Sequence, residues 1–159
     1  MKLHKQAGVA AVELALILVP MLVLCLGIAE LGRALYQYDG VVKAGRGAAR
    51  YLTLQSLSQA ASYNAAVAVA KSLAVCGKNS CAASDPRLVA GLDDVSQVSV
   101  DKYPNVPTGK GTASLVLVTI SGVRFTSILP GPSLLIRFVD SKGGIAFAPA
   151  TITMAYSTT

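Results

Sequence analysis

A single carboxylate, Glu13, interrupts the apolar run Val9–Ala29 near the N-terminus. A charged side chain at the centre of a membrane-spanning helix costs about 2.5–3.5 kcal/mol on insertion scales, and less toward the helix end. Glu13 stands about one helical turn after Val9, so its carboxylate could also reach the lipid headgroups. Two roles therefore stay open at this point: a side chain that snorkels to the interface, or an acid that pairs with a positive charge.

The spacing between Gly8 and Glu13 favours the pairing role. A short basic leader, residues 1–8, ends at the glycine, and Glu13 is the fifth residue after it. This pattern resembles the processing site of type IV prepilins, in which a membrane peptidase cuts after the glycine. Cleavage would create an α-amino group at Val9, with an unperturbed pKa of about 7.7–8.0. In a filament of such subunits, Glu13 could pair with Val9 of a neighbour and so select the axial register.

Cys76 and Cys81 are the second pair of residues whose side chains could take part in chemistry, and a short polar loop separates them. This spacing predicts a small disulfide ring formed in an oxidising compartment, with unpaired thiols as the alternative. A metal site would need further ligands, and the only histidine is His4 in the leader. Cys25 lies inside the apolar run and is most simply a small apolar residue.

The sequence contains no catalytic constellation. One histidine cannot anchor a conventional catalytic triad or a histidine-based metal site, and no Gly-rich loop continues into a phosphate-binding Lys-Ser/Thr. The adjacent acids Asp93 and Asp94 could bind a cation, but such a pair in a turn is usually only solvated. The basic residues are scattered without stacking aromatics, which argues against nucleic acid as a partner. We expect no enzymatic activity, no metal and no cofactor.

The apolar run that carries Glu13 predicts a membrane helix. As an α-helix, Val9–Ala29 would be about 30 Å long, which is the hydrocarbon thickness of a bilayer, and we assign residues 9–31 to the membrane. The composition agrees, with 53% apolar and only 14% charged residues and a net charge of +6. Charges flanking the run give the opposite orientation from the one we expect: Lys2 and Lys5 precede it, whereas Arg33, Lys43, Arg46 and Arg50 follow it. We nevertheless expect an inside N-terminus, because the cysteine pair requires an extracytoplasmic C-terminal part.

A helical pattern continues beyond the membrane run. Apolar residues recur from Leu31 to Leu52 at spacings of three, four and seven, and most charged residues fall outside that face. We assign residues 32–57 to this continuation. Gly40, Gly45 and Gly47 each weaken a helix by up to about 1 kcal/mol, so a kink and a continuous helix both remain open.

Three motifs in the first third of the chain resemble the N-terminal region of TadE-like proteins, pilin-like subunits of the tight-adherence (Tad) pilus system. The first is Val12-Glu13-Leu14-Ala15-Leu16, in which Leu14 stands where an aromatic residue is common. The second is Gly27-x-x-Glu30-x-Gly32-Arg33. The third, Ala44–Tyr51, contains Arg46 and Arg50, with Gly47 shifted and Ala48 where a glycine is common. The resemblance covers about residues 8–52, and the remainder only loosely.

The rest of the chain predicts a small α+β domain. An Ala-rich stretch from Ser58, the expected N-cap, to Val75 predicts a second helix that Gly77 ends. Three stretches with alternating or β-branched residues predict an antiparallel meander on the helical part: Val95–Asp101, Thr112–Val123 and Ala148–Tyr156. Turns are expected at Tyr103–Gly111 and Ile128–Pro132, and the conformation of Leu134–Phe138 stays open. We assign residues 58–159 to an extracytoplasmic domain.

The resemblance implies a minor pilin or pseudopilin of the bacterial inner membrane. Its expected partners are the prepilin peptidase, other pilin-like subunits, the Tad assembly platform and membrane lipid. The expected site residues are Gly8 and Val9 for processing, Glu13 for register, the family residues Glu30, Gly32, Arg33, Arg46 and Arg50, and the disulfide Cys76–Cys81. Two alternatives remain: a pseudopilin of a type II secretion machine, which the Glu30 and Arg46/Arg50 motifs disfavour, and a signal-anchored extracytoplasmic binding domain.

Overall fold

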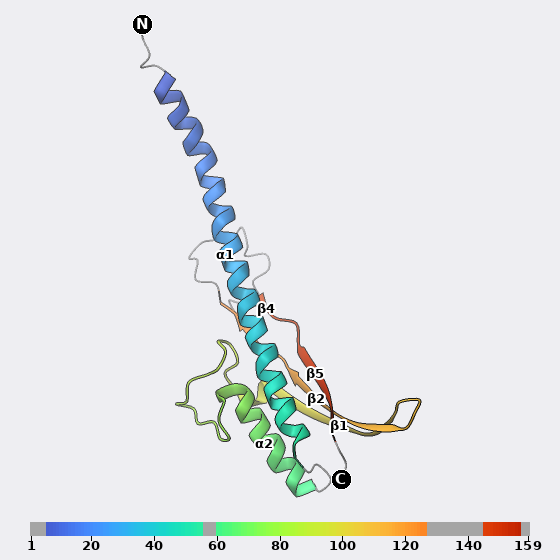
Figure 1. Cartoon of the computed structure of the whole chain (residues 1–159). Coiled ribbons are helices and arrows are strands. Elements are labelled where there is room, and N and C mark those ends of the chain that lie inside the picture. Colours follow the sequence, from blue (N-terminus) through green and yellow to red (C-terminus); the bar gives the residue numbers. More distant parts are fainter. Residues whose placement is uncertain (1–5, 56–59, 127–144, 157–159) are drawn as a thin grey trace. The chain divides into compact units, whose positions relative to one another are not determined.

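The computed structural model confirms the predicted α+β class. It describes residues 6–55, 60–126 and 145–156 (Figure 1). Along the chain these residues form α1 (Gln6–Thr53), α2 (Ala60–Cys76), the short 3-10 helix η1 (Val95–Gln97), β1 (Val98–Pro107), β2 (Thr112–Ile120), β3 (Arg124–Phe125), β4 (Ile145–Ala146) and β5 (Ala150–Tyr156). The chain divides into two compact units, Met1–Leu35 and Tyr36–Thr159, which are described separately.

The first helix, α1, runs without a break through Pro20 and through all its glycines. The open question of a kink at Gly40–Gly47 is therefore settled in favour of one continuous helix. Its last turn tightens, since Leu54 and Gln55 donate backbone hydrogen bonds to the carbonyls three residues earlier. The helix ends at Thr53, whose hydroxyl donates to the Arg50 carbonyl at 2.8 Å. It is thus shorter than the predicted continuation to residue 57, and residues 56–57 lie outside the described part.

The second helix, α2, ends where the sequence predicts. Gly77 adopts a left-handed φ of 70°, which a residue with a Cβ rarely accepts, and its N–H donates to the Leu73 carbonyl at 3.0 Å. A Cβ at Gly77 would also lie 3.2 Å from the Leu88 side chain. The predicted N-cap, Ser58, lies outside the described residues.

The sheet has the antiparallel order β1-β2-β5, so the three predicted strands are present. Val118 in the central strand lies opposite Val100 of β1 and Ile152 of β5. Alternate residues of β2 are buried, namely Ser114, Val116, Val118 and Ile120, as expected for a sheet with one face on a core. A second, two-stranded ribbon pairs β3 with β4 and was not predicted.

Two boundaries of β1 differ from the prediction. The strand does not begin at Val95, because Val95–Gln97 form η1, and the Asp94 carboxylate and the Gln97 side chain cap that turn reciprocally. The strand also continues to Pro107 through most of the predicted turn at Tyr103–Gly111. A register shift between Tyr103 and Val106, with Asn105 at a φ of 56°, lets the proline-containing chain stay paired at a sheet edge.

The core of the second unit lies where α1, α2 and the sheet meet. Small residues dominate the helical side of this core, including Ala48, Ala49, Ala66, Ala70 and Ala74, and the sheet supplies Val116, Val118 and Ile120. Val41 and Leu52 complete the buried face of α1. Small side chains permit close helix–sheet packing. This packing explains why the second part of α1 is helical although its glycines lower its helix propensity.

Gly45 and Gly47 have opposite surroundings, although both belong to α1. A Cβ at Gly45 would lie 2.5 Å from Ile152 Cδ1 and 3.3 Å from Ile120 Cδ1, whereas a Cβ at Gly47 would meet nothing within 4 Å. We predict that Gly45→Leu lowers the free energy of unfolding by about 1–3 kcal/mol through overpacking. Gly47→Leu should leave it unchanged or raise it by up to about 1 kcal/mol through helix propensity.

Thermal unfolding of the full chain in detergent, followed by circular dichroism, checks this pair. Each variant serves as the control for the other, because both replace a helical glycine by leucine. Equal unfolding temperatures for the two variants would contradict the packing described for α1.

Candidate functional site

The N-terminal part of α1 presents an apolar surface. Each residue from Gly8 to Leu26 is exposed. By length and composition, α1 is apolar enough to cross a membrane: its most apolar 18 residues have a mean hydropathy of 2.7, and none of them is buried. Gly8, Val9 and Glu13, the three residues of the expected processing and register site, all lie on this exposed part. The Glu13 carboxylate makes no ion pair or hydrogen bond with any residue that the structure describes. A helix of this composition suggests a membrane-anchored protein.

Glu30 and Arg33 form an ion pair within α1, just after the apolar run. Arg33 Nη2 donates to Glu30 Oε2 at 3.2 Å, and the Glu30 side chain is only 13% exposed. Gly32 lies between them and is exposed. Because the Arg33 guanidinium neutralises the Glu30 carboxylate, this end of the apolar helix carries a paired acid rather than an isolated one.

Arg46 and Arg50 lie on the solvent side of α1, together with Gly47 and Lys43. They stand one helical turn apart and are exposed, whereas Ala48 and Ala49 on the same helix are buried. Lys43 is paired with Asp39 at 2.7 Å, whereas neither arginine forms an ion pair with a residue in the described ranges. Of the expected site residues, the structure brings only Glu30 to Arg33 and Cys76 to Cys81.

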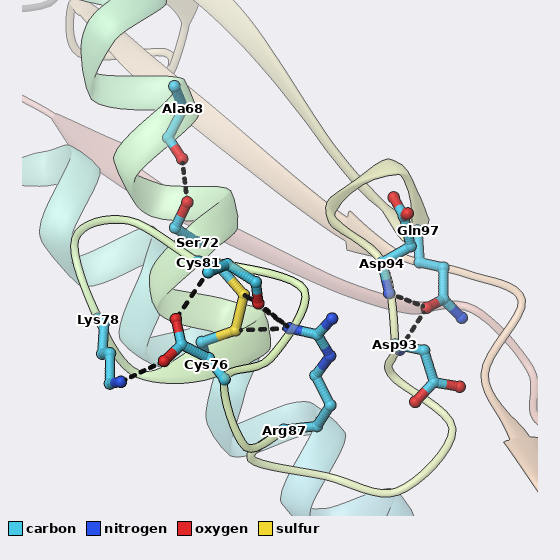
Figure 2. Close-up of a disulfide and its surroundings, with 11 residues drawn as sticks. Ala68, Ser72, Cys76, Lys78, Cys81, Arg87, Asp93, Asp94 and Gln97 are labelled. Atoms are coloured by element: carbon cyan, nitrogen blue, oxygen red, sulfur yellow. Dashed lines mark hydrogen bonds and ion pairs between the residues drawn. A yellow bond between two sulfur atoms is a disulfide. The ribbon is translucent and has the colours of Figure 1, made fainter.

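The loop after α2 is closed by a disulfide between Cys76 and Cys81, whose Cα atoms are 5.8 Å apart (Figure 2). Arg87 reaches back to this bridge, with its Nη1 2.9 Å from each sulfur and 3.3 Å from the Ala82 carbonyl oxygen. Asp85 accepts from the Ala82 N–H at 2.8 Å and from the Lys78 ammonium. The sequence reasoning missed these three charged residues; their closeness to the cysteines in sequence was the available signal.

The sequence reasoning also missed the role of Gln37. The Gln37 amide donates to the carbonyl of Ala90 and, at 3.0 Å, to that of Arg124. One side chain of α1 thus binds both the loop that follows α2 and strand β3. The position could not be recognised from helical periodicity, because the two acceptors are backbone atoms distant in sequence.

No metal or catalytic centre emerges from the described part of the chain. It contains no group of three or more His, Cys, Asp or Glu side chains that could hold a metal ion. Asp94, one of the two adjacent acids, caps η1 instead, since its carboxylate accepts from the Ser96 N–H at 2.6 Å. That hydrogen bond lowers the pKa of Asp94.

The Lys78 hydrogen bond is the main reason why the pKa of Asp85 lies below its usual range, and the Ala82 N–H adds to the effect. Because a lowered pKa in the folded state favours the charged form, the contribution of Asp85 to stability is present above its unfolded pKa. It is lost as the pH falls through the lower folded value. We predict that Lys78→Gln raises the pKa of Asp85 toward the ordinary value.

Carboxyl carbon shifts of Asp85 followed by NMR between neutral and strongly acidic pH measure this change. Lys110→Gln removes an equal charge at an exposed position of the β1–β2 turn and serves as the matched control. An identical titration of Asp85 in the wild type and in Lys78→Gln would show that the ion pair does not form.

The disulfide should stabilise the end of α2. Joining residues separated by 5 in the sequence removes loop entropy from the unfolded chain, which corresponds to about 2 kcal/mol in the chain-entropy account. We predict that Cys76→Ser combined with Cys81→Ser lowers the free energy of unfolding by about that amount. Denaturant unfolding of the full chain in detergent measures it. Cys25→Ser, on the exposed apolar helix, is the control and should leave stability unchanged. A double variant with the same free energy of unfolding as the wild type would show that the disulfide does not contribute to stability.

The comparisons with known proteins agree with the N-terminal motifs. Searches of curated proteins and of solved structures found no match. A family model described as TadE-like protein matches residues 8–50. The matched segment begins at Gly8 and includes Glu13, the Glu30–Arg33 pair and both exposed arginines. The match relates the chain to the proteins of the Tad pilus and confirms the resemblance that its motifs predicted: residues 8–50 are similar to the TadE-like family.

Proposed function

We propose that this chain is a minor pilin or pseudopilin that supports assembly of a Tad-type pilus. The observation that carries the proposal is the TadE-like match over residues 8–50, which coincides with the exposed apolar part of α1 and its continuation. The chain would act by helix packing with other pilin-like subunits and with the assembly platform. Its role would be structural rather than enzymatic, in keeping with the TadE-like match.

The proposed location is the bacterial inner membrane, with a single span at residues 9–31 and residues 58–159 outside the cytoplasm. The apolar helix supports the anchoring. The Cys76–Cys81 disulfide supports an extracytoplasmic domain, because disulfides persist in oxidising compartments. The count of flanking positive charges points the other way, so the disulfide is the stronger argument for this orientation.

The proposed processing step is cleavage between Gly8 and Val9 by a prepilin peptidase. The new ammonium group of Val9 would then face a carboxylate of an adjacent subunit, and Glu13 is the acid available on the exposed helix. Either charge alone is expensive in an apolar environment. Pairing them between subunits therefore favours one axial register over the others.

The N-terminus of the mature chain tests the processing step. We predict that mass spectrometry of the protein from membranes with their native peptidase finds Val9 as the first residue. Gly8→Leu should block the cut, whereas Gly27→Leu, a glycine of the same helix with free space around it, should be cleaved normally. A chain that retains Met1 in peptidase-competent cells would refute processing and favour a plain signal anchor.

Replacement of Glu13 tests the assembly step separately. Glu13→Gln keeps the size of the side chain and removes its charge, so cleavage should persist while pilus assembly is lost. Assembly that survives Glu13→Gln would favour the signal-anchored binding domain. Co-purification with a type II secretion platform instead of the Tad platform would identify the other alternative.

A further inference from the structure

The outward side of α1 in the second unit has the features of a docking surface for a helix. At 3.6 residues per turn, Tyr36, Lys43, Gly47 and Arg50 share the side opposite to the buried Val41, Gly45, Ala48 and Leu52. Tyr36 is 80% exposed, which is unusual for a large aromatic side chain on a folded unit. The glycine in the middle of this side leaves the helix backbone open to close approach.

A groove adjoins this side of the helix. It has a volume of about 410 Å³ and lies between α1, α2 and the loop that follows α2, lined by Gly40, Lys43, Ala44, Gly47, Leu73, Leu88 and Val89. Six of these seven residues are apolar or glycine, so the groove fits an aliphatic side chain. The aliphatic part of Lys43 lines it while the ammonium group stays with Asp39.

Arg46 and Arg50 give this surface its charge. Two guanidinium groups four residues apart on a helix repel each other. Among the described residues, no carboxylate compensates either of them, whereas Lys43, only one turn away, has Asp39. The surface defined by Asp39, Lys43, Arg46 and Arg50 therefore carries two uncompensated positive charges.

We propose that the groove and the two arginines bind an amphipathic helix of a different protein, which places an aliphatic side chain in the groove and carboxylates against Arg46 and Arg50. A second copy of this chain fits poorly, because an isologous contact would bring identical positive charges together. Anionic lipid is disfavoured, because the arginines stand many residues beyond Ala29, outside the juxtamembrane position in which basic residues meet headgroups. The inference deepens the proposed function, on which it rests for the existence of a partner, by naming that partner's chemistry.

Two synthetic helical peptides test the proposal with the full chain held in nanodiscs of zwitterionic lipid. Both peptides carry a leucine stripe on an alanine background; one has glutamates beside the stripe at every fourth position, and its twin has glutamines there. Fluorescence anisotropy should give the glutamate peptide an affinity about threefold to tenfold higher than its twin, as expected for two exposed ion pairs. The preference should weaken as salt is added.

Matched variants locate the binding surface. The preference for glutamate should disappear in R46Q/R50Q and persist in K71Q/K110Q, which removes two charges elsewhere. Gly47→Leu should lower the affinity for both peptides equally, because the leucine side chain would occupy the approach to the groove. Equal affinity for the two peptides, or a glutamate preference that survives R46Q/R50Q, would overturn the proposal.

Two further outcomes would also overturn it. Displacement of the glutamate peptide by anionic lipid vesicles, dependent on the two arginines, would identify a lipid surface as the ligand. Self-association of the chain that R46Q/R50Q alters would identify a second copy. N-terminal cleavage is not involved in any of these measurements, so failure here and failure of the processing step are distinguishable.

Discussion

Close packing of α1 on the sheet is the constraint on which the second unit depends. Gly45 lies where the helix backbone approaches Ile120 and Ile152, and Ala48 and Ala49 are buried in the same core. The buried residues of α1 are therefore mostly glycine and alanine, and Val41 and Leu52 are the larger ones. Such packing leaves little tolerance for added volume at Gly45. It also explains why a helix weakened by glycines remains unbroken here.

The same helix meets two different requirements along its length. Its first part is exposed and apolar on all sides, as a membrane segment requires, and its second part is amphipathic with a buried alanine face. The Glu30–Arg33 pair stands just after the apolar part, and every further ionised group on α1 lies on the solvent side of the second unit. Apart from Glu13, the arrangement of charge on α1 thus follows the change of environment along the helix.

The sequence predicted the features that depend on local pattern. The apolar run, the α+β class, the three main strands and the glycine end of α2 all follow from periodicity and composition. Helix propensity treats Gly45 and Gly47 alike, however, and only the tertiary contacts show that the backbone at Gly45 packs against Ile152 and Ile120. The η1 turn was not predicted because its alternating residues are typical of a strand. The reciprocal cap between Asp94 and Gln97 stabilises a 3-10 turn there instead. Arg87 and Gln37 depend on loops that no local pattern places.

The two prolines of β1 have a consequence for molecules of this chain at high local concentration. β1 is an edge strand of the sheet, and Pro104 and Pro107 offer no N–H to a strand that might line up beside it. Lys102 adds a charge along the same strand, and the irregular pairing near Asn105 bends it. An edge of this kind resists accidental sheet-to-sheet fusion between neighbouring molecules. Neighbouring molecules at high local concentration therefore do not aggregate through this strand.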